Sequence, residues 1–191
     1  MNKLDTFKIV IAHKTDYDFE DGAYSYLETS VLINGQAVGE YTDISAFITN
    51  FNVTNSREKE VAAFHIWDKK LQDFILRKDA LLPDSDFYPF TCSCGVSGCA
   101  SIWQGVFQKV RKHTVEWRIF DKEENGYHFL DKSFYRFEKE NYESEIRKAW
   151  KYLLDNKHVM VDSHGEETTT WEQECSWMYE QFPEAIKQLE M

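Results

Sequence analysis

The sequence predicts a single α+β domain, residues 1–191, in which a mainly antiparallel sheet packs against two to three helices. Two observations predict this class. Much of the first two thirds alternates apolar and polar residues with the period of two that is typical of strands, whereas the last third repeats apolar residues at three- and four-residue steps. The predicted strands follow one another through short turns, which favours antiparallel pairing. The chain is also long enough to bury a core without a metal or a disulfide.

The N-terminal part is predicted to form strands. In residues 7–12 and again in residues 27–33, alternate positions are apolar and share one face. Asn34 and Gly35 follow the second run, and both residue types tolerate the positive φ angles of a two-residue hairpin turn. A third strand is expected over residues 41–52.

A change of period marks the next element. Apolar residues in 67–78 recur at helical spacing, which predicts an amphipathic helix. Pro83 begins a turn-forming stretch that ends it, and three cysteines follow directly, in residues 92–99.

The middle of the chain is predicted to return to strands. Residues 101–110 and 114–120 form a pair, with Arg111-Lys112-His113 as their turn, and residues 127–137 supply the next strand. The cysteines and these strands make up the region 85–150.

The C-terminal part, residues 139–190, is predicted to be helical. Apolar residues share one face in a helix over 139–154, where Glu143 and Arg147 are spaced for an i,i+4 ion pair. A second helical pattern covers residues 168–190, and Pro183 is suited to the first turn of its last segment.

The net charge of the chain indicates which kinds of partner it can bind. The chain has 33 Asp and Glu residues against 22 Lys and Arg residues, a net charge of −11, so we expect no nucleic-acid partner and favour a basic protein partner. No stretch has the length and apolarity of a signal peptide or a membrane span, so we expect a cytoplasmic protein that does not enter membranes.

Cys92, Cys94 and Cys99 are the densest set of candidate metal ligands. Three thiolates suit zinc, but a structural zinc site needs four ligands. The run resembles a zinc-binding module that carries Cys-x-Cys followed by Cys-x-His, except that Ser101 stands in place of the histidine. The fourth ligand is therefore unknown, and a cofactor is not the favoured interpretation, with zinc as the alternative.

Two further interpretations of the cysteines stay open. Gly95 and Gly98 suit a tight knuckle between a loop and a strand, beneath which the thiols pack as small apolar groups. A redox role is the other, because neighbouring thiols can form a disulfide.

The segment Pro89-Phe-Thr-Cys-Ser-Cys-Gly-Val-Ser-Gly-Cys, with Val115-Glu-Trp117 after it, resembles a widespread group of small, largely uncharacterised bacterial proteins. These carry Cys-x-Cys-Gly-x-x-Gly-Cys, a hairpin whose second strand contains Val-x-Trp, and then an aromatic strand and a helix. The resemblance covers residues 85–150 and implies a fold element rather than an activity. Acidic bacterial proteins of this size are similar in character to immunity proteins, which neutralise a cognate toxin.

These observations favour a protein-binding module over an enzyme. The sequence contains no nucleophile elbow, phosphate-binding loop or His-Glu-x-x-His pair, although a catalytic site assembled from distant residues stays open. The most concrete form of the prediction is an acidic immunity protein that binds a basic toxin. The alternative is a metal-binding or thiol-dependent protein that acts through Cys92, Cys94 and Cys99.

Overall fold

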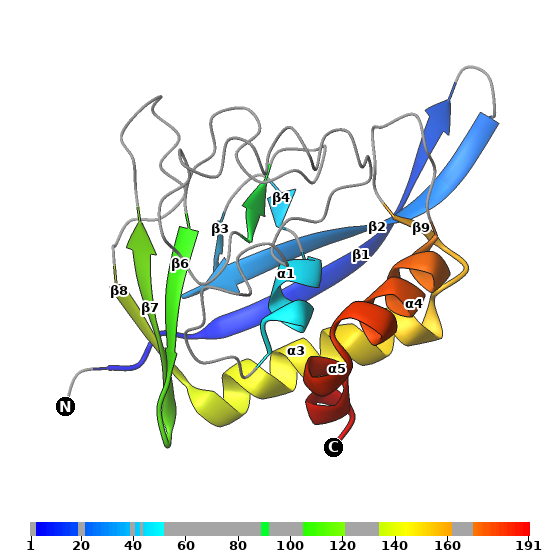
Figure 1. Cartoon of the computed structure of the whole chain (residues 1–191). Helices are drawn as coiled ribbons and strands as arrows, with labels where there is room; N and C mark the ends of the chain where they lie inside the picture. Colours follow the sequence, from blue (N-terminus) through cyan, green and yellow to red (C-terminus); the bar gives the residue numbers. More distant parts are fainter. Residues whose placement is uncertain are drawn as a thin grey trace, which may run out of the picture.

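The computed structural model describes residues 3–18, 22–38, 41–42, 44–51, 89–91, 105–120, 134–161 and 170–191. Within these ranges the chain forms strands and helices in separate parts of the molecule (Figure 1), which confirms the predicted α+β class. The strands are β1 (Phe7–Asp18), β2 (Gly22–Ile33), β3 (Gln36–Val38), β4 (Tyr41–Thr42), β5 (Phe90–Thr91), β6 (Gly105–Val110), β7 (Thr114–Phe120), β8 (Phe134–Glu138) and β9 (Met160–Val161); the helices are α1 (Ile44–Thr49), α3 (Lys139–Asp155), α4 (Trp171–Gln181) and α5 (Pro183–Glu190).

The pairing of the strands is mainly antiparallel, as predicted. One sheet has the order β1-β2-β3, and β9 joins β2 in parallel. A second sheet has the order β6-β7-β8, and β4 and β5 form a separate antiparallel pair. Helices α3, α4 and α5 gather on one side of the molecule, below and in front of the long β1–β2 ribbon in Figure 1.

The hairpin predicted at Asn34-Gly35 is confirmed. These residues have φ angles of 54° and 80°, the left-handed values that a tight turn between β2 and β3 requires. In β2, Leu27, Val31 and Ile33 are buried on one face, as the alternation predicted.

The strand predicted at residues 41–52 is wrong beyond its first two residues. Only Tyr41–Thr42 pairs as a strand, and Ile44–Thr49 forms the helix α1, every residue of which is buried. A short helix that is buried all round has no polar face, so its sequence lacks the helical period and its β-branched residues mimic a strand. Thr49 Oγ1 donates to the Ser45 carbonyl at 2.8 Å.

Phe7 is the centre of the core and joins both larger sheets to the helices. Its ring centroid lies 4.5 Å from that of Tyr142 in α3, 5.4 Å from Phe137 in β8, 5.7 Å from Trp117 in β7 and 5.9 Å from Phe47 in α1. Pairs at these separations add to the free energy that burial of each ring contributes. A single aromatic residue therefore contacts four elements.

A buried hydrogen-bonded group lies beside this cluster. Gln108 Oε1 accepts hydrogen bonds from the Tyr142 hydroxyl at 2.7 Å and from Trp117 Nε1 at 3.3 Å. Burial raises the pKa of the Tyr142 hydroxyl well above its ordinary value, so it remains a neutral donor. The donors of two large aromatic residues are thus satisfied inside the core.

The C-terminal helices confirm the predicted pattern. In α3, all five residues expected to face inward are buried: Tyr142, Ile146, Ala149, Trp150 and Leu153. Pro183 opens α5 as predicted, and a capping box formed by Thr170 and Gln173 starts α4.

One predicted side-chain contact of α3 is wrong. Glu143 pairs with Lys139 at 3.4 Å instead of with Arg147, whose Nη1 donates to the carbonyls of Gln188 and Leu189 in α5, both at 2.6 Å. Two hydrogen bonds to fixed carbonyls at a helix end stabilise a guanidinium more than an exposed ion pair does. The residue spacing within α3 contains no information about this contact with α5.

Several predicted elements lie outside the described residues. These are the helix at 67–78, the cysteine run at 92–99, and the first part of the strand at 127–137. In the part of the chain that is described, no helix combines the length and the apolarity needed to span a membrane.

Candidate functional site

The predicted metal ligands Cys92, Cys94 and Cys99 fall outside the described residues, so their arrangement stays a prediction. Within the described residues, no group of three or more Cys, His, Asp and Glu side chains is placed to hold a metal ion. His113, in the turn predicted between the two strands that follow the cysteines, is exposed between β6 and β7, and its backbone carbonyl accepts a hydrogen bond from the Lys139 amide at 3.0 Å.

The fourth cysteine, Cys175, is a free thiol buried in α4. Burial, reinforced by the negative charge of Glu174 and opposed by Lys157, raises the pKa of this thiol to about 12. The thiolate is the reactive form of cysteine, so Cys175 serves packing rather than chemistry.

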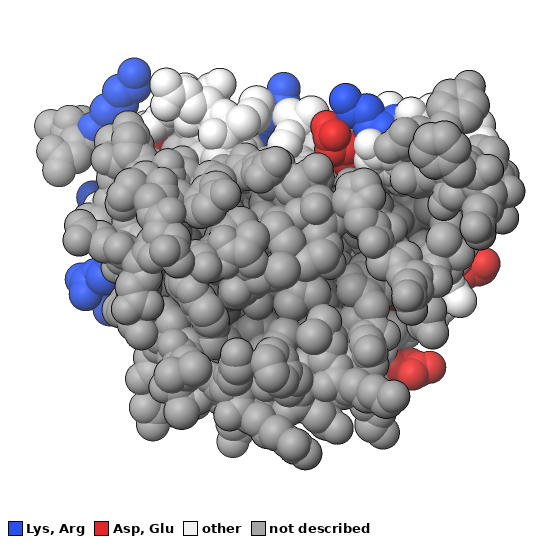
Figure 2. Space-filling view, turned by 90° about the horizontal axis from the view of Figure 1, so that it is seen from above, with Lys and Arg blue, Asp and Glu red and all other residues white. Residues whose placement is uncertain are grey.

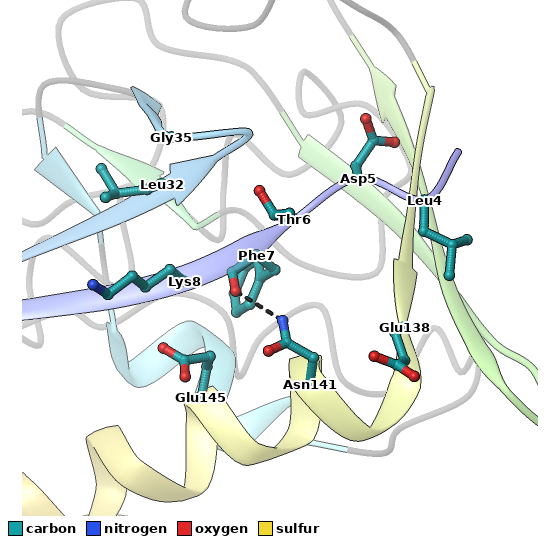
Figure 3. A pocket seen from close by; sticks show the side chains of 10 residues that line it. All are labelled: Leu4, Asp5, Thr6, Phe7, Lys8, Leu32, Gly35, Glu138, Asn141 and Glu145. Carbon is teal, nitrogen blue, oxygen red and sulfur yellow. Dashed lines mark hydrogen bonds between the residues drawn. The ribbon is translucent and has the colours of Figure 1, made fainter. Parts of the chain in front are cut away.

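A groove with a volume of about 470 Å³ lies between the N-terminal segment, the β2–β3 turn and the start of α3 (Figure 3). Asn141 Nδ2 donates to the Phe7 carbonyl at 2.9 Å, and Glu145 Oε2 accepts from the Ile9 amide at 3.2 Å. These bonds satisfy polar groups on the edge of β1 that faces α3, which protects this edge from pairing with another strand. Much of the groove's polar lining therefore serves the fold.

The N-terminal wall of the groove is held by Asp5. Its carboxylate accepts hydrogen bonds from Asn34 Nδ2 at 2.9 Å and from the Arg136 amide at 3.0 Å, so it links the β2–β3 turn to β8. Lys8 and Glu138 are exposed at the groove and form no ion pair within the described residues. Among the described residues that line the groove, Lys8 and Glu138 offer one exposed charge of each sign, which suits polar contact with a ligand.

The second candidate is the exposed surface of α4 and α5, which we call the acidic helical face. Glu172, Glu180 and Glu184 are exposed on it, and Lys187 is its only Lys or Arg. Figure 2 views the molecule from above, so α5, which lies at the bottom of Figure 1, is on the far side. Among the described residues in that view, Lys and Arg side chains lie along the left and upper edges, and Asp and Glu side chains lie near the upper centre and at the lower right edge.

Aromatic side chains accompany the carboxylates of the acidic helical face. Trp177 and Phe182 are half-buried and pack edge to face with centroids 5.2 Å apart. Tyr179 is 42% exposed, packs against Trp150 at 5.5 Å and donates its hydroxyl proton to Glu190. Partial burial and this bond to a carboxylate raise the pKa of Tyr179 to about 12. The aromatic rings are therefore held in place before any partner binds.

Arg147 holds α5, and with it the acidic helical face, against the rest of the molecule. Besides its bonds to the α5 carbonyls, its guanidinium carbon lies 4.9 Å from the centroid of the Phe51 ring. Contacts from α3 and from the end of α1 thereby fix the position of α5.

The sequence indicated an acidic protein with a basic partner but not where its carboxylates gather, and no sequence pattern indicated the groove. Phe90, Tyr135 and Phe137, from the aromatic-rich stretches beside the cysteines and after residue 127, are buried in the core, whereas Phe134 is 44% exposed. Asn34-Gly35 is the one sequence signal that lies at the groove. Comparison of the chain with family models, curated proteins and solved structures found no match.

Proposed function

We propose that this chain is a protein-binding module whose acidic helical face docks on a basic partner, most concretely a toxin that it neutralises as an immunity protein. The single observation that carries the proposal is the combination, on one pair of helices, of exposed carboxylates and partly exposed aromatic rings. Charged and aromatic groups in this combination are typical of the anchors and rims of protein interfaces.

The charge of the last two helices supports this partner. Residues 170–191 contain five acidic side chains and one basic side chain: Glu172, Glu174, Glu180, Glu184 and Glu190 against Lys187. Exposed carboxylates with few cations nearby attract a basic surface over a Debye length and accelerate its association. The overall charge of −11 acts in the same direction.

The aromatic groups supply the short-range part of the interaction. Tyr179 and Trp177 each combine a large apolar ring with a polar atom, and neither is fully buried. Such residues lose little side-chain entropy on binding because packing already restricts them. Tyr179 is restricted by both Trp150 and Glu190.

The same proposal places the protein in the cytoplasm, without a nucleic-acid partner and without a required cofactor. An immunity protein must meet its toxin where the toxin would act, and a basic nuclease would act on cytoplasmic nucleic acid. Such an enzyme has a positive substrate-binding surface, which an acidic protein can cover.

The experiment is a binding assay with the protein encoded by the reading frame next to this gene. We expect binding whose association rate falls steeply with ionic strength, and a double variant, Glu180→Lys with Glu184→Lys, that associates about tenfold more slowly. Glu140→Lys, at an exposed position of α3, is the matched control and should retain most of the wild-type rate. An association rate that is indifferent to salt and to the double variant would refute docking through the acidic helical face.

A further inference from the structure

The outward face of the β6-β7-β8 sheet is the opposite of the acidic helical face in charge, and we call it the basic sheet face. Inward-facing residues of these strands, such as Val106, Val115 and Trp117, are buried, so the alternate residues face solvent. Cross-strand register arranges the outward residues in two rows, Phe107-Arg118-Phe134 and Lys109-Glu116-Arg136.

This face and its turn carry an excess of positive charge. Residues 105–120 and 134–138 contain five Lys and Arg residues, at 109, 111, 112, 118 and 136, against two Glu residues, at 116 and 138. Glu116 pairs with Arg111 at 3.2 Å and with Arg136 at 3.3 Å. Lys109, Lys112 and Arg118 are exposed and form no ion pair within the described residues.

Exposed apolar groups accompany both charged surfaces. Among the described residues, four large hydrophobic side chains are exposed. Phe134, 44% exposed, lies on the basic sheet face, and Leu4, 39% exposed, lies next to it because Asp5 pairs with Phe137 of β8. The other two, Tyr179 and Met191, belong to the C-terminal helices. Each surface therefore joins charge of one sign to two exposed apolar groups.

We propose that the basic sheet face is a docking site for the acidic helical face of a second copy of this chain. The charge of the two surfaces is complementary, and both have exposed apolar side chains on or beside them that can make contact. They lie apart in the molecule, with β6 to β8 at the left of Figure 1, α5 at the lower centre and α4 to the right of centre. The contact is thus head-to-tail, and association is concentration-dependent.

A second copy fits this face better than a nucleic acid does. Glu116 lies in the middle of the second row, but its carboxylate is already paired with Arg111 and Arg136. The exposed cations Lys109, Lys112 and Arg118 are therefore the groups that can meet the carboxylates of a partner. Phe134, exposed on this face, can pack against an apolar side chain of a polypeptide such as Tyr179 of a second copy, whereas a phosphate backbone offers no apolar group. Toxin binding and self-association would compete, since both use the acidic helical face. The self-association requires no toxin and so does not depend on the proposed function.

The test uses the whole chain with two double variants whose substitutions lie at exposed positions. The sheet variant is Lys109→Glu with Lys112→Glu, and the helix variant is Glu180→Lys with Glu184→Lys. Sedimentation velocity over a concentration series is expected to show association of the wild type at about 0.01 M salt, where the Debye length is about 30 Å, and dissociation at about 1 M. Each variant alone should associate at least about tenfold more weakly.

The decisive measurement is an equimolar mixture of the two variants. The sheet variant presents an acidic sheet face, which can bind the helical face that the helix variant has made basic. The unaltered faces of the two variants are also opposite in charge. The mixture should therefore associate more strongly than either variant alone. Lys151→Glu, at an exposed position of α3, should behave as the wild type. Circular dichroism of each variant would separate loss of docking from loss of folding.

Three results would overturn the proposal. One is a wild type that stays monomeric at every concentration and salt. Another is a wild type whose self-association neither double variant weakens, or double variants whose lost association is not restored in the equimolar mixture. The third is a monomeric wild type that binds a single-stranded RNA oligonucleotide and loses it in the sheet variant, which would assign the basic sheet face to nucleic acid instead. Because none of these measurements contains the toxin, they leave the proposed function separately testable.

Discussion

Replacement of Arg147 by methionine is expected to loosen α5 and to destabilise the protein. The change removes two hydrogen bonds to the α5 carbonyls of Gln188 and Leu189 and the contact with the Phe51 ring. Methionine keeps an aliphatic stem of similar length, so little packing volume is lost.

The expected loss can be worked out from these contacts. Hydrogen bonds from charged donors contribute about 1.5–3 kcal/mol each, and we take the lower value because carbonyls at a helix end regain hydrogen bonds from water. Two such bonds amount to about 3 kcal/mol, and the contact of the cation with the ring adds about 0.5–1 kcal/mol. The free energy of unfolding should therefore fall by about 3.5–4 kcal/mol, and the melting temperature by about 10 °C.

Urea unfolding of Arg147→Met beside Lys148→Met measures this loss. Lys148 is the next residue along α3, and its side chain is 69% exposed although it pairs with Glu145 at 2.7 Å. Its replacement should change the free energy of unfolding by no more than about 1 kcal/mol, since exposed ion pairs contribute little. Hydrogen exchange should become faster in α5 of Arg147→Met alone. Equal effects of the two substitutions would refute the assignment of Arg147 as the residue that anchors α5.

Three further predictions concern the β2–β3 hairpin, the stability of the fold at alkaline pH and the metal content of the cysteine run. Gly35→Ala should lower the free energy of unfolding by about 1 kcal/mol, measured with urea, because Gly35 has a φ of +80° and the added methyl group meets nothing within 4 Å, so only backbone strain contributes. The free energy of unfolding should decline as pH rises from about 9 towards 12, because folding raises the pKa of Cys175 from 9.0 and that of Tyr179 from 10.0, each to about 12, so that the unfolded chain ionises first. In a pH series of urea unfolding curves, Cys175→Ser should show a shallower decline than the wild type. An unchanged decline would contradict the burial of this thiol. Protein purified without a chelator should contain far less than one zinc ion per chain by elemental analysis, whereas stoichiometric zinc that is lost in Cys94→Ser would establish the metal-binding alternative.

Local patterns predicted those elements that have two distinguishable faces. The inward residues of α3 recur at helical steps, and β2 alternates, so each sequence contains the period of its own structure. Helix α1 has no exposed face, and its sequence therefore contained no period to recognise. The partner of Arg147 was mispredicted for a related reason, because a spacing within one helix describes only contacts along that helix.

The candidate sites depended on contacts between distant parts of the chain. The groove brings residues near position 5 together with the turn at Asn34-Gly35 and with α3, and no local pattern relates these segments. The acidity of the C-terminal helices is visible in the sequence, but the rigid placement of Tyr179 against Trp150 and Glu190 is not. Composition predicts that an acidic surface exists, and only the packing shows which carboxylates and rings share it.

The sequence by itself determined the α+β class, the Asn34-Gly35 hairpin, the inward faces of the C-terminal helices and the acidic character of the chain, because each follows from residue type and spacing over one or two turns or strands. Only the tertiary structure decided that Phe7 joins four elements in one core, that Arg147 holds α5, and that Tyr179 is held against Trp150 and Glu190. The physical reason is that these properties arise from contacts between residues far apart in the chain, whose energies depend on distance in space and leave no period in the sequence.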